Sequence, residues 1–340
     1  MKRIIFVTAA VICTATFLFP KFWPKKEVDI SGFGYHSHPD IASSGRNVYI
    51  CWIQKYEQPS KESYLNFQRS SDNGRTWLKH PIRIDRRDPA KGKIERPRIA
   101  ASDSYVYVVW RDTRNGKSDI YLNSSANKGR TWLKKDIRID LGDKPGASHA
   151  YVAEIAVAGS YVYVVWHDMR NGEADIYFNV SSDHGFTWNE SPVRLDGDAP
   201  GSADSRNARI ASANRKVYVV WQDDRNGNYD IYINCSISNG RIWMSTPIRL
   251  DVGSPAGAAD SLKPQIAAYQ RACYVVWEDY RDTNADVYFN YSRNNGARWQ
   301  TIDIRLDCGD QAGENDSLNP QIATARRMVY VVWELSLIHI

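Results

Sequence analysis

The sequence is poor in cysteine, in helical patterns and in net charge. Five cysteines in 340 residues occupy unrelated positions, so no disulfide framework is predicted. Helical apolar periodicity is scarce, whereas 20 tyrosines and 12 tryptophans favour an all-β fold. Five of the 44 basic residues lie in the first 26 positions, which leaves 39 basic against 39 acidic residues. A neutral remainder has no bulk electrostatic reason to bind nucleic acid, and we expect no such partner.

Residues 1–26 are predicted to be a signal peptide or an N-terminal anchor. Lys2 and Arg3 precede an apolar run over residues 4–19, which Pro20 ends. Its 16 residues are few for a membrane span and suit the core of a signal peptide. No clear small-x-small cleavage site precedes Pro20, so membrane anchoring through residues 4–19 stays open. Both alternatives predict a protein that is secreted or held outside the cytoplasm.

The rest of the chain repeats with a period of 55 or 56 residues. Each copy contains a segment such as Tyr-Val-Tyr-Val-Val-Trp, then Asp-x-Arg-Asn-Gly, then Asp-Ile-Tyr-x-Asn, then a glycine turn that ends in tryptophan. Four short strand candidates per copy are typical of a propeller blade rather than of a helical solenoid. The tryptophans of the glycine turns are Trp77, Trp132, Trp188, Trp243 and Trp299.

We therefore predict an all-β fold, a six-bladed β-propeller of four-stranded antiparallel blades over residues 27–334. The last blade is partial, and seven blades stay open as an alternative. Residues 335–340 match no repeat and are expected to be a non-native tail, so that the natural chain would continue past Glu334. The predicted blades cover roughly residues 38–95, 96–151, 152–206, 207–262, 263–318 and 319–334.

The repeated glycine turn has a structural explanation. Short side-chain oxygens can bond nearby backbone N–H groups, glycine takes positive φ without steric cost, and tryptophan buries a large area. Asn127, Ser238 and Asn294 replace the aspartate in three copies, which a metal site would tolerate less well. We expect no cofactor, with calcium as the minority alternative. The structural residues are Ser70, Asp72, Gly74, Trp77, Gly129, Trp132, Asp183, Gly185, Trp188, Gly240, Trp243, Gly296 and Trp299.

The pattern Ser-x-Asp-x-Gly-x-x-Trp resembles the Asp box, or bacterial neuraminidase repeat, of the sialidase superfamily. The resemblance covers residues 38–334 with five copies at a fixed period. It implies blades in which each Asp box joins the third and fourth strands, and active sites on the opposite face of the propeller. It also implies a catalytic set of three arginines, a tyrosine–glutamate nucleophile pair and an aspartic acid.

One position in the first strand of each blade differs between copies. It is the x of Pro-x-Ile-Ala, and because first strands lie nearest the axis of a propeller, it should line the central channel. The alternatives are a network of ion pairs and amides that fills the channel, since buried charges must be paired, and a polar ligand pocket. The residues are Asp40, Arg98, Glu154, Arg209, Gln265 and Gln321.

The implied catalytic set is incomplete. Asp40 stands in the first blade where the family pattern has its first arginine, and Arg98 and Arg209 are the nearest matches. Tyr151 and Glu154 are candidates for the nucleophile pair, and no third arginine is identifiable. Near-identical blades favour a binding module for a glycan or an extracellular protein. The alternative is an exo-acting glycoside hydrolase of the exo-α-sialidase type, because one fold hosts many functions.

Overall fold

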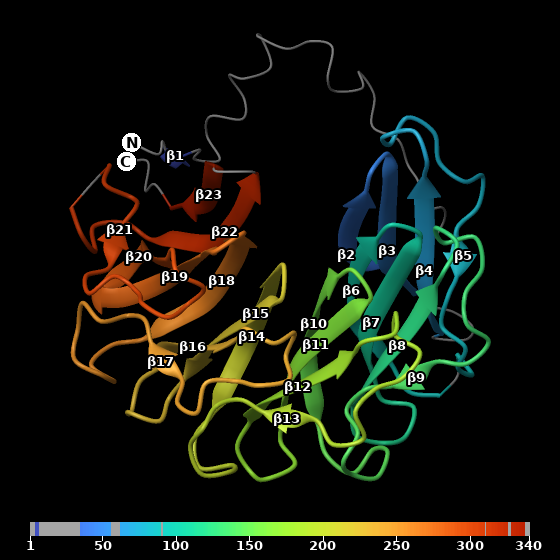
Figure 1. The fold of residues 1–340 in the computed structure, drawn as a ribbon, viewed down its shortest axis with the longest axis horizontal. Coiled ribbons are helices and arrows are strands. Elements are labelled where there is room, and N and C mark those ends of the chain that lie inside the picture. The colour runs from blue at the N-terminus through green and yellow to red at the C-terminus, as the bar shows by residue number, and fades with distance from the viewer. Residues whose placement is uncertain are drawn as a thin grey trace. The chain divides into compact units, whose positions relative to one another are not determined.

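The computed structural model describes residues 4–6, 35–55, 62–89, 91–309, 311–325 and 328–336. The chain forms two compact units, residues 28–194 and residues 195–340 with 1–27, called here the N-terminal and C-terminal units. Every regular element in the described part is a strand (Figure 1). Within those ranges no helix is long and apolar enough to cross a membrane. Apart from residues 4–6, the predicted signal peptide or anchor lies outside the described residues.

The N-terminal unit holds three four-stranded antiparallel sheets, in which consecutive strands are neighbours. The first contains β2 (Tyr35–Ser44), β3 (Asn47–Lys55), β4 (Ser63–Ser70) and β5 (Ile82–Arg83). The second contains β6 (Ile94–Ser102), β7 (Tyr105–Asp112), β8 (Asp119–Ser125) and β9 (Ile137–Arg138). The third contains β10 (Ala150–Ala158), β11 (Tyr161–Asp168), β12 (Asp175–Ser181) and β13 (Val193–Arg194).

The C-terminal unit holds two more such sheets and one of three strands. The first contains β14 (Ser205–Ala213), β15 (Lys216–Asp223), β16 (Asp230–Ser236) and β17 (Ile248–Arg249). The second contains β18 (Ser261–Tyr269), β19 (Ala272–Asp282), β20 (Asn284–Ser292) and β21 (Ile304–Arg305). The third pairs β22 (Ser317–Ala325) with β23 (Met328–Leu335), and β1 (Ile4–Phe6) pairs in parallel with β23.

These sheets confirm the predicted all-β fold of four-stranded antiparallel blades. From the second blade onward, the first strand begins two residues before the predicted start of its blade, at residues 94, 150, 205, 261 and 317. The two extra residues continue the pairing with the second strand beyond a register shift, which the sequence pattern did not reveal.

The second strand β7 is buried on both faces because its alternate side chains enter different cores. Val106, Val108 and Trp110 of β7 pack with residues of β3 and β4. Tyr107 and Val109 pack with residues of β10 and β11. Burial of each large apolar side chain contributes roughly 1.5–3 kcal/mol. The Tyr-Val-Tyr-Val-Val-Trp pattern of β7 therefore joins the second blade to the first and third blades of the N-terminal unit.

The glycine turn fixes the hairpin between the third and fourth strands. Ser70 Oγ accepts from Gly74 N at 2.9 Å, and Asp72 Oδ1 accepts from Thr76 N at 2.8 Å. Trp77 Nε1 donates to Gly74 O at 3.0 Å, so the ring folds back over the turn. The carboxylate is not required, because Asn127 Oδ1 and Ser238 Oγ accept the equivalent backbone bonds at 2.8 and 2.7 Å.

The Asp-x-Arg turn is a buried cluster of four groups. Asp168 Oδ2 accepts from Trp166 Nε1 at 3.0 Å and from Arg170 Nη2 at 2.6 Å. The Arg170 guanidinium lies 4.4 Å from the ring centroid of Tyr177. Equivalent groups recur around Asp112, Asp223 and Asp279. Because all four copies have this arrangement, the motif builds the blade.

Candidate functional site

Each first strand carries a β-bulge at the same place. The register shifts between Glu95 and Arg98 in β6, and between Tyr151 and Glu154 in β10. One residue inside each bulge has positive φ, and two residues later comes the predicted channel position. A bulge re-aims the side chains beside it and often lies next to a functional site. The residues with positive φ are His38, Arg96, Val152, Asn207, Lys263 and Asn319.

In the N-terminal unit the predicted channel residues contact the neighbouring blade. Asp40 Oδ2 accepts from Ile99 N at 2.8 Å. Arg98 Nε donates to Glu154 Oε1 at 2.9 Å, and their side chains are 26% and 15% exposed. Burial raises the pKa of Asp40, although the Ile99 hydrogen bond opposes the rise. Burial lowers the pKa of Arg98, but Glu154 outweighs it and raises the pKa.

In the C-terminal unit the channel position is occupied by a guanidinium and two amides. Arg209 Nε donates to Gln265 Oε1 at 3.2 Å, whereas Gln321 is exposed. Arg98 and Arg209, the two candidates for substrate arginines, thus lie in different units.

Val152 distinguishes the third blade from the others. Its φ is 41°, and it is the one β-branched residue among the six bulge positions. A β-branched side chain at positive φ is a genuine outlier, and backbone strain of this kind costs roughly 1–3 kcal/mol. The strain lies between Tyr151 and Glu154, the two residues that the sequence singled out.

Tyr151 lies in a group of aromatic rings with a cation over its face. Its ring centroid is 5.4 Å from that of His149 and 5.3 Å from that of His167. The Arg111 guanidinium carbon lies 4.3 Å from the Tyr151 centroid, within cation–π distance. Arg111 also forms an ion pair with Glu95. Tyr151 therefore packs with these groups, while Glu154 pairs with Arg98.

His149 contacts Ser118 beside this group of rings. Its Nδ1 lies 3.1 Å from Ser118 Oγ and 3.4 Å from Ser118 N. Burial lowers the pKa of His149, and the positive charges of Arg111 and Lys117 lower it further. The neutral imidazole of His149 therefore packs beside Tyr151, and Arg111 remains the cation over the Tyr151 ring.

Arg111 and His167 belong to a second group of residues that differ between blades, and these residues lie on the second strand rather than on the first. Each is the residue directly after the tryptophan of the second strand, and it pairs with the residue before the bulge. The blades differ here, which is the signal that would have found the set in the sequence. The residues are Ile53, Arg111, His167, Gln222, Glu278 and Glu334.

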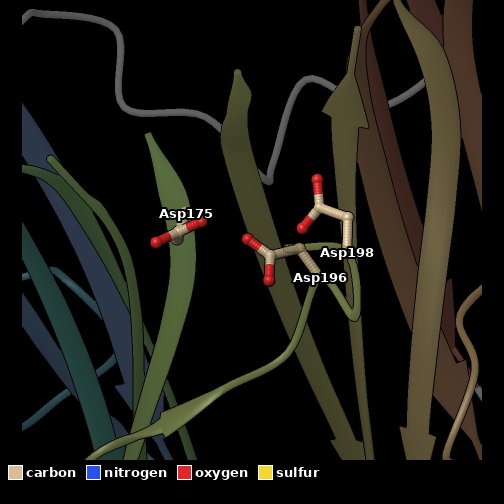
Figure 2. Close-up of side chains that lie close together, drawn as sticks. All are labelled: Asp175, Asp196 and Asp198. Atoms are coloured by element: carbon tan, nitrogen blue, oxygen red, sulfur yellow. The ribbon is translucent and has the colours of Figure 1, made fainter. Parts of the chain in front are cut away.

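Figure 2 shows Asp175, Asp196 and Asp198, whose side-chain carboxylates are possible ligands of a metal ion. Asp175 begins β12 in the N-terminal unit, and Asp196 and Asp198 follow β13 in the C-terminal unit. Asp175 accepts from Asn171 Nδ2 at 2.6 Å and lies 3.3 Å from Arg194 Nη1. Asp119 has the same asparagine and arginine partners, so the arrangement belongs to the blade. We assign no metal here, and calcium stays the minority alternative.

No protein-family model and no curated protein sequence matches this chain. Solved structures do match it in fold. An α-L-arabinanase from Penicillium chrysogenum, complexed with arabinobiose, is 15% identical with a TM-score of 0.52, over 80% of this chain and 81% of that one. The α-L-arabinofuranosidase arb93a from Fusarium graminearum is 13% identical with a TM-score of 0.56, over 86% and 85%.

The Hadza microbial sialidase Hz136 is 14% identical with a TM-score of 0.53. The match covers 88% of this chain but 65% of the sialidase, so the chain spans less than two thirds of that enzyme. At these identities the likeness shows the fold alone. The chain thus has the β-propeller fold of these solved structures, as the sequence resemblance implied.

Proposed function

We propose that this protein recognises glycans, and that its ligand patch lies on the second and third blades. The patch comprises Glu95, Arg98, Arg111, Tyr151 and Glu154. A tyrosine ring beside a guanidinium and two carboxylates offers apolar surface for a sugar ring and charged groups for its hydroxyls. The observation that carries the proposal is the group around Tyr151 next to the strained Val152.

Two further facts support this proposal. Strain at a buried residue persists only where the surroundings impose it, and it clusters at ligand and active sites. The solved neighbours in fold are named as an arabinanase, an arabinofuranosidase and a sialidase, all of which act on glycans. The repeated Asp–Arg and tryptophan turns, by contrast, have structural partners in every described copy.

Isothermal titration calorimetry with a saccharide panel tests the proposal. The panel consists of arabinobiose, lactose and sialyllactose. Tyr151→Leu is the variant, because Leu262 and Leu318 occupy the equivalent position in other blades. Tyr269→Ala is the matched control, because Ala158 and Ala213 occupy that position elsewhere. We expect tenfold or greater loss of affinity in Tyr151→Leu alone; a wild-type protein that binds no panel member contradicts the proposal.

An exo-acting glycoside hydrolase is the second candidate function. Tyr151 and Glu154 flank the strained bulge, and Glu154 is held by Arg98 at 2.9 Å. Turnover of a fluorogenic sialoside or a fluorogenic arabinofuranoside tests it. Turnover that disappears in both Arg98→Ala and Arg209→Ala would establish this candidate over the binding module. A wild-type protein without turnover excludes it for these substrates.

We further propose that the protein acts outside the cytoplasm, as a secreted or anchored protein. The support is the basic and apolar pattern of residues 1–26. Cell fractionation of the full chain, with N-terminal sequencing of the product, tests both alternatives. A cleaved N-terminus indicates secretion, an intact N-terminus in the membrane fraction indicates anchoring, and a cytosolic product contradicts the proposal.

A further inference from the structure

A group of exposed basic side chains surrounds the tryptophan turn of the second blade. The group is called here the basic patch and consists of Arg86, Lys128, Arg130, Lys134 and Lys135. Four of its members follow one another within residues 128–135. Arg86 comes from the first blade and adjoins them, because its Nε donates to Leu133 O at 3.0 Å. The patch therefore lies within the N-terminal unit, across two neighbouring blades.

The carboxylates near the basic patch do not neutralise it. Asp136, the next residue in the chain, accepts from Asn123 Nδ2 at 2.9 Å and from Arg114 Nη2 at 3.0 Å. Its side chain is 1% exposed, so its charge is used inside the blade. In the adjoining segments, residues 87–92 and 102–105, the exposed carboxylates are Asp88 and Asp103. Five cations thus stand against two exposed carboxylates, and the patch keeps a net positive charge.

The tryptophan turns of other blades form without these charges. At the four turn positions the fourth and fifth blades have neutral residues, namely Asn239 for Lys128, Ala297 for Arg130, Ser245 for Lys134 and Thr246 for Lys135. The glycine N–H of the turn donates to a serine hydroxyl at 3.0 Å in both the second and the fourth blade. The basic side chains are therefore not needed to build the turn.

Lys128 also occupies a backbone position that disfavours it. Its φ is 59°, and the equivalent positions in the other turns have φ between 57° and 65° and hold Asn73, His184, Asn239 and Asn295. Asparagine is enriched in this left-handed region because its short polar side chain bonds the local backbone, whereas lysine is not. Lysine at position 128 therefore adds a charge to the patch at a small conformational cost.

The arrangement of the cations fits a polymer with repeated negative charges. Arg75 and Lys79 of the first blade are exposed at the places equivalent to Arg130 and Lys134, so the same charges recur in the adjacent turn. Arginine and lysine form charge-assisted hydrogen bonds with sulfate and carboxylate groups. Cations that recur along a surface can pair with several units of one polyanion.

The apolar side chains of the turn favour a polysaccharide among the polyanions. Trp132 is 8% exposed. Apart from Ala126, every exposed residue in 126–135 is polar or charged. Binding of single-stranded nucleic acid uses exposed aromatic rings for stacking, and insertion into a membrane surface uses exposed apolar side chains. An anionic polysaccharide needs neither, because ion pairs and hydrogen bonds hold it.

We propose that the basic patch binds an anionic polysaccharide, at the end of the second blade opposite the ligand patch. Lys128 N donates to Ser104 O at 2.7 Å, just beyond the end of β6. Glu95 and Arg98 of the ligand patch lie near the start of that strand. The inference therefore goes beyond the proposed function, since a small neutral saccharide has no charge that this second surface would bind.

Fluorescence anisotropy with labelled heparin, a sulfated polysaccharide, tests the proposal. The patch variant carries Lys128→Asn, Arg130→Ala, Lys134→Ser and Lys135→Thr, each taken from the equivalent position of another blade. We expect tenfold or greater loss of heparin affinity, with a Tm that is unchanged or higher because asparagine suits position 128. The affinity of the wild type should fall as salt is added, because salt screens exposed charges. The double variant Lys134→Ser/Lys135→Thr should show a smaller loss in the same direction.

The matched control removes the same charge away from the tryptophan turn. It replaces four exposed lysines of the N-terminal unit by glutamine, namely Lys91, Lys93, Lys117 and Lys144. This control should bind heparin nearly as well as the wild type. Tyr151→Leu, the variant of the ligand patch, should keep full heparin affinity, so that the two proposals are tested separately.

Three results would overturn the inference. The first is a wild type that binds neither heparin nor polygalacturonate at low salt. The second is an equal loss of affinity in the patch variant and in the lysine control, which would mean that net charge alone governs binding. The third is tighter binding to duplex DNA or to phosphatidylglycerol vesicles than to heparin, because the patch would then serve a different partner. None of these results bears on the binding of neutral saccharides at the ligand patch.

Discussion

The six bulge residues share a positive φ but differ in the side chain that the backbone has to accommodate there. Five of the bulge residues are His, Arg, Lys or Asn, whose side chains tolerate positive φ better than a β-branched one. Val152 departs from this set and lies beside Tyr151. Valine at position 152 strains the backbone, and no other blade has a β-branched residue at this position. We therefore place the ligand patch beside it.

Asn207 offers a direct measure of the backbone cost at a bulge. Its φ is 52°, and its Nδ2 donates to Gln222 Oε1 at 2.8 Å. Asn207→Ala removes the side-chain bond, and Asn207→Val removes it and adds a β-branched side chain. We expect Asn207→Val to be less stable than Asn207→Ala by about 1 kcal/mol or more in urea unfolding. Equal stabilities would show that the bulge imposes no such strain.

Gly129 combines positive φ with close packing against the previous blade. Its φ is 74°, and an added Cβ would lie 2.4 Å from Phe67 Cζ. Gly45 is the matched control, because its φ is 59° and an added Cβ would meet nothing within 4 Å. We expect Gly129→Ala to cost about 2–3 kcal/mol and Gly45→Ala about 1 kcal/mol in unfolding free energy. Similar losses would mean that contact with Phe67 does not limit the turn.

The Asp-x-Arg turn acts as one element because its carboxylate is shared. Asp168 is fully buried and accepts from Trp166, from Arg170 N and from Arg170 Nη2. Asp168→Ala should lower the unfolding free energy by about 3–5 kcal/mol, because it leaves a buried guanidinium unpaired. Asp183→Ser should change it by less than about 1 kcal/mol, because Ser238 fills that role in another blade. Thermal unfolding of both variants checks the contrast.

Three buried aspartates make the stability of the fold sensitive to pH. Burial raises the pKa of Asp140 to about 7; Arg138 opposes the rise and Asp119 adds to it. Burial likewise raises the pKa of Asp251 to about 7 and that of Asp286 to about 6. Between pH 4 and 7 the unfolded chain releases these protons while the folded chain keeps them. Their contribution to stability is therefore present below pH 4 and is lost as the pH rises toward 7.

Asp140→Asn removes one of these titrations. We expect the wild-type unfolding free energy, measured in urea, to fall relative to that of the variant by on the order of 2 kcal/mol between pH 4 and 7.5. Carboxylates with lowered pKa values, such as Asp183 at about 2, are present in both proteins and cancel in the comparison. Parallel pH profiles would contradict the raised pKa of Asp140.

For the whole molecule, the sequence predicted the parts that repeat and missed those that depend on pairing between strands. The tryptophan turns and the doubly buried second strands follow from local patterns that recur five or six times. The bulges could not be predicted, because they are a mismatch between two strands and leave no mark in either alone. They set both the strand starts and the direction of the channel residues.

The candidate site was predicted in part for the same reason. Arg98 and Glu154 were selected by variation within one strand, and the structure pairs them at 2.9 Å. Arg111 lies on the neighbouring strand, directly after a tryptophan that recurs in every blade, so the first-strand pattern does not include it. Its place beside the bulge follows from the cross-strand register, in which it pairs with Glu95.

Hydrogen–deuterium exchange with and without a bound saccharide tests the central claim, that the positions which differ between blades bind the ligand. The ligand is the panel member that binds in calorimetry. We predict slower exchange in β6 and β10. The tryptophan turns, such as residues 70–77, should be unchanged. Protection confined to the tryptophan turns, with none in the first strands, would contradict the account.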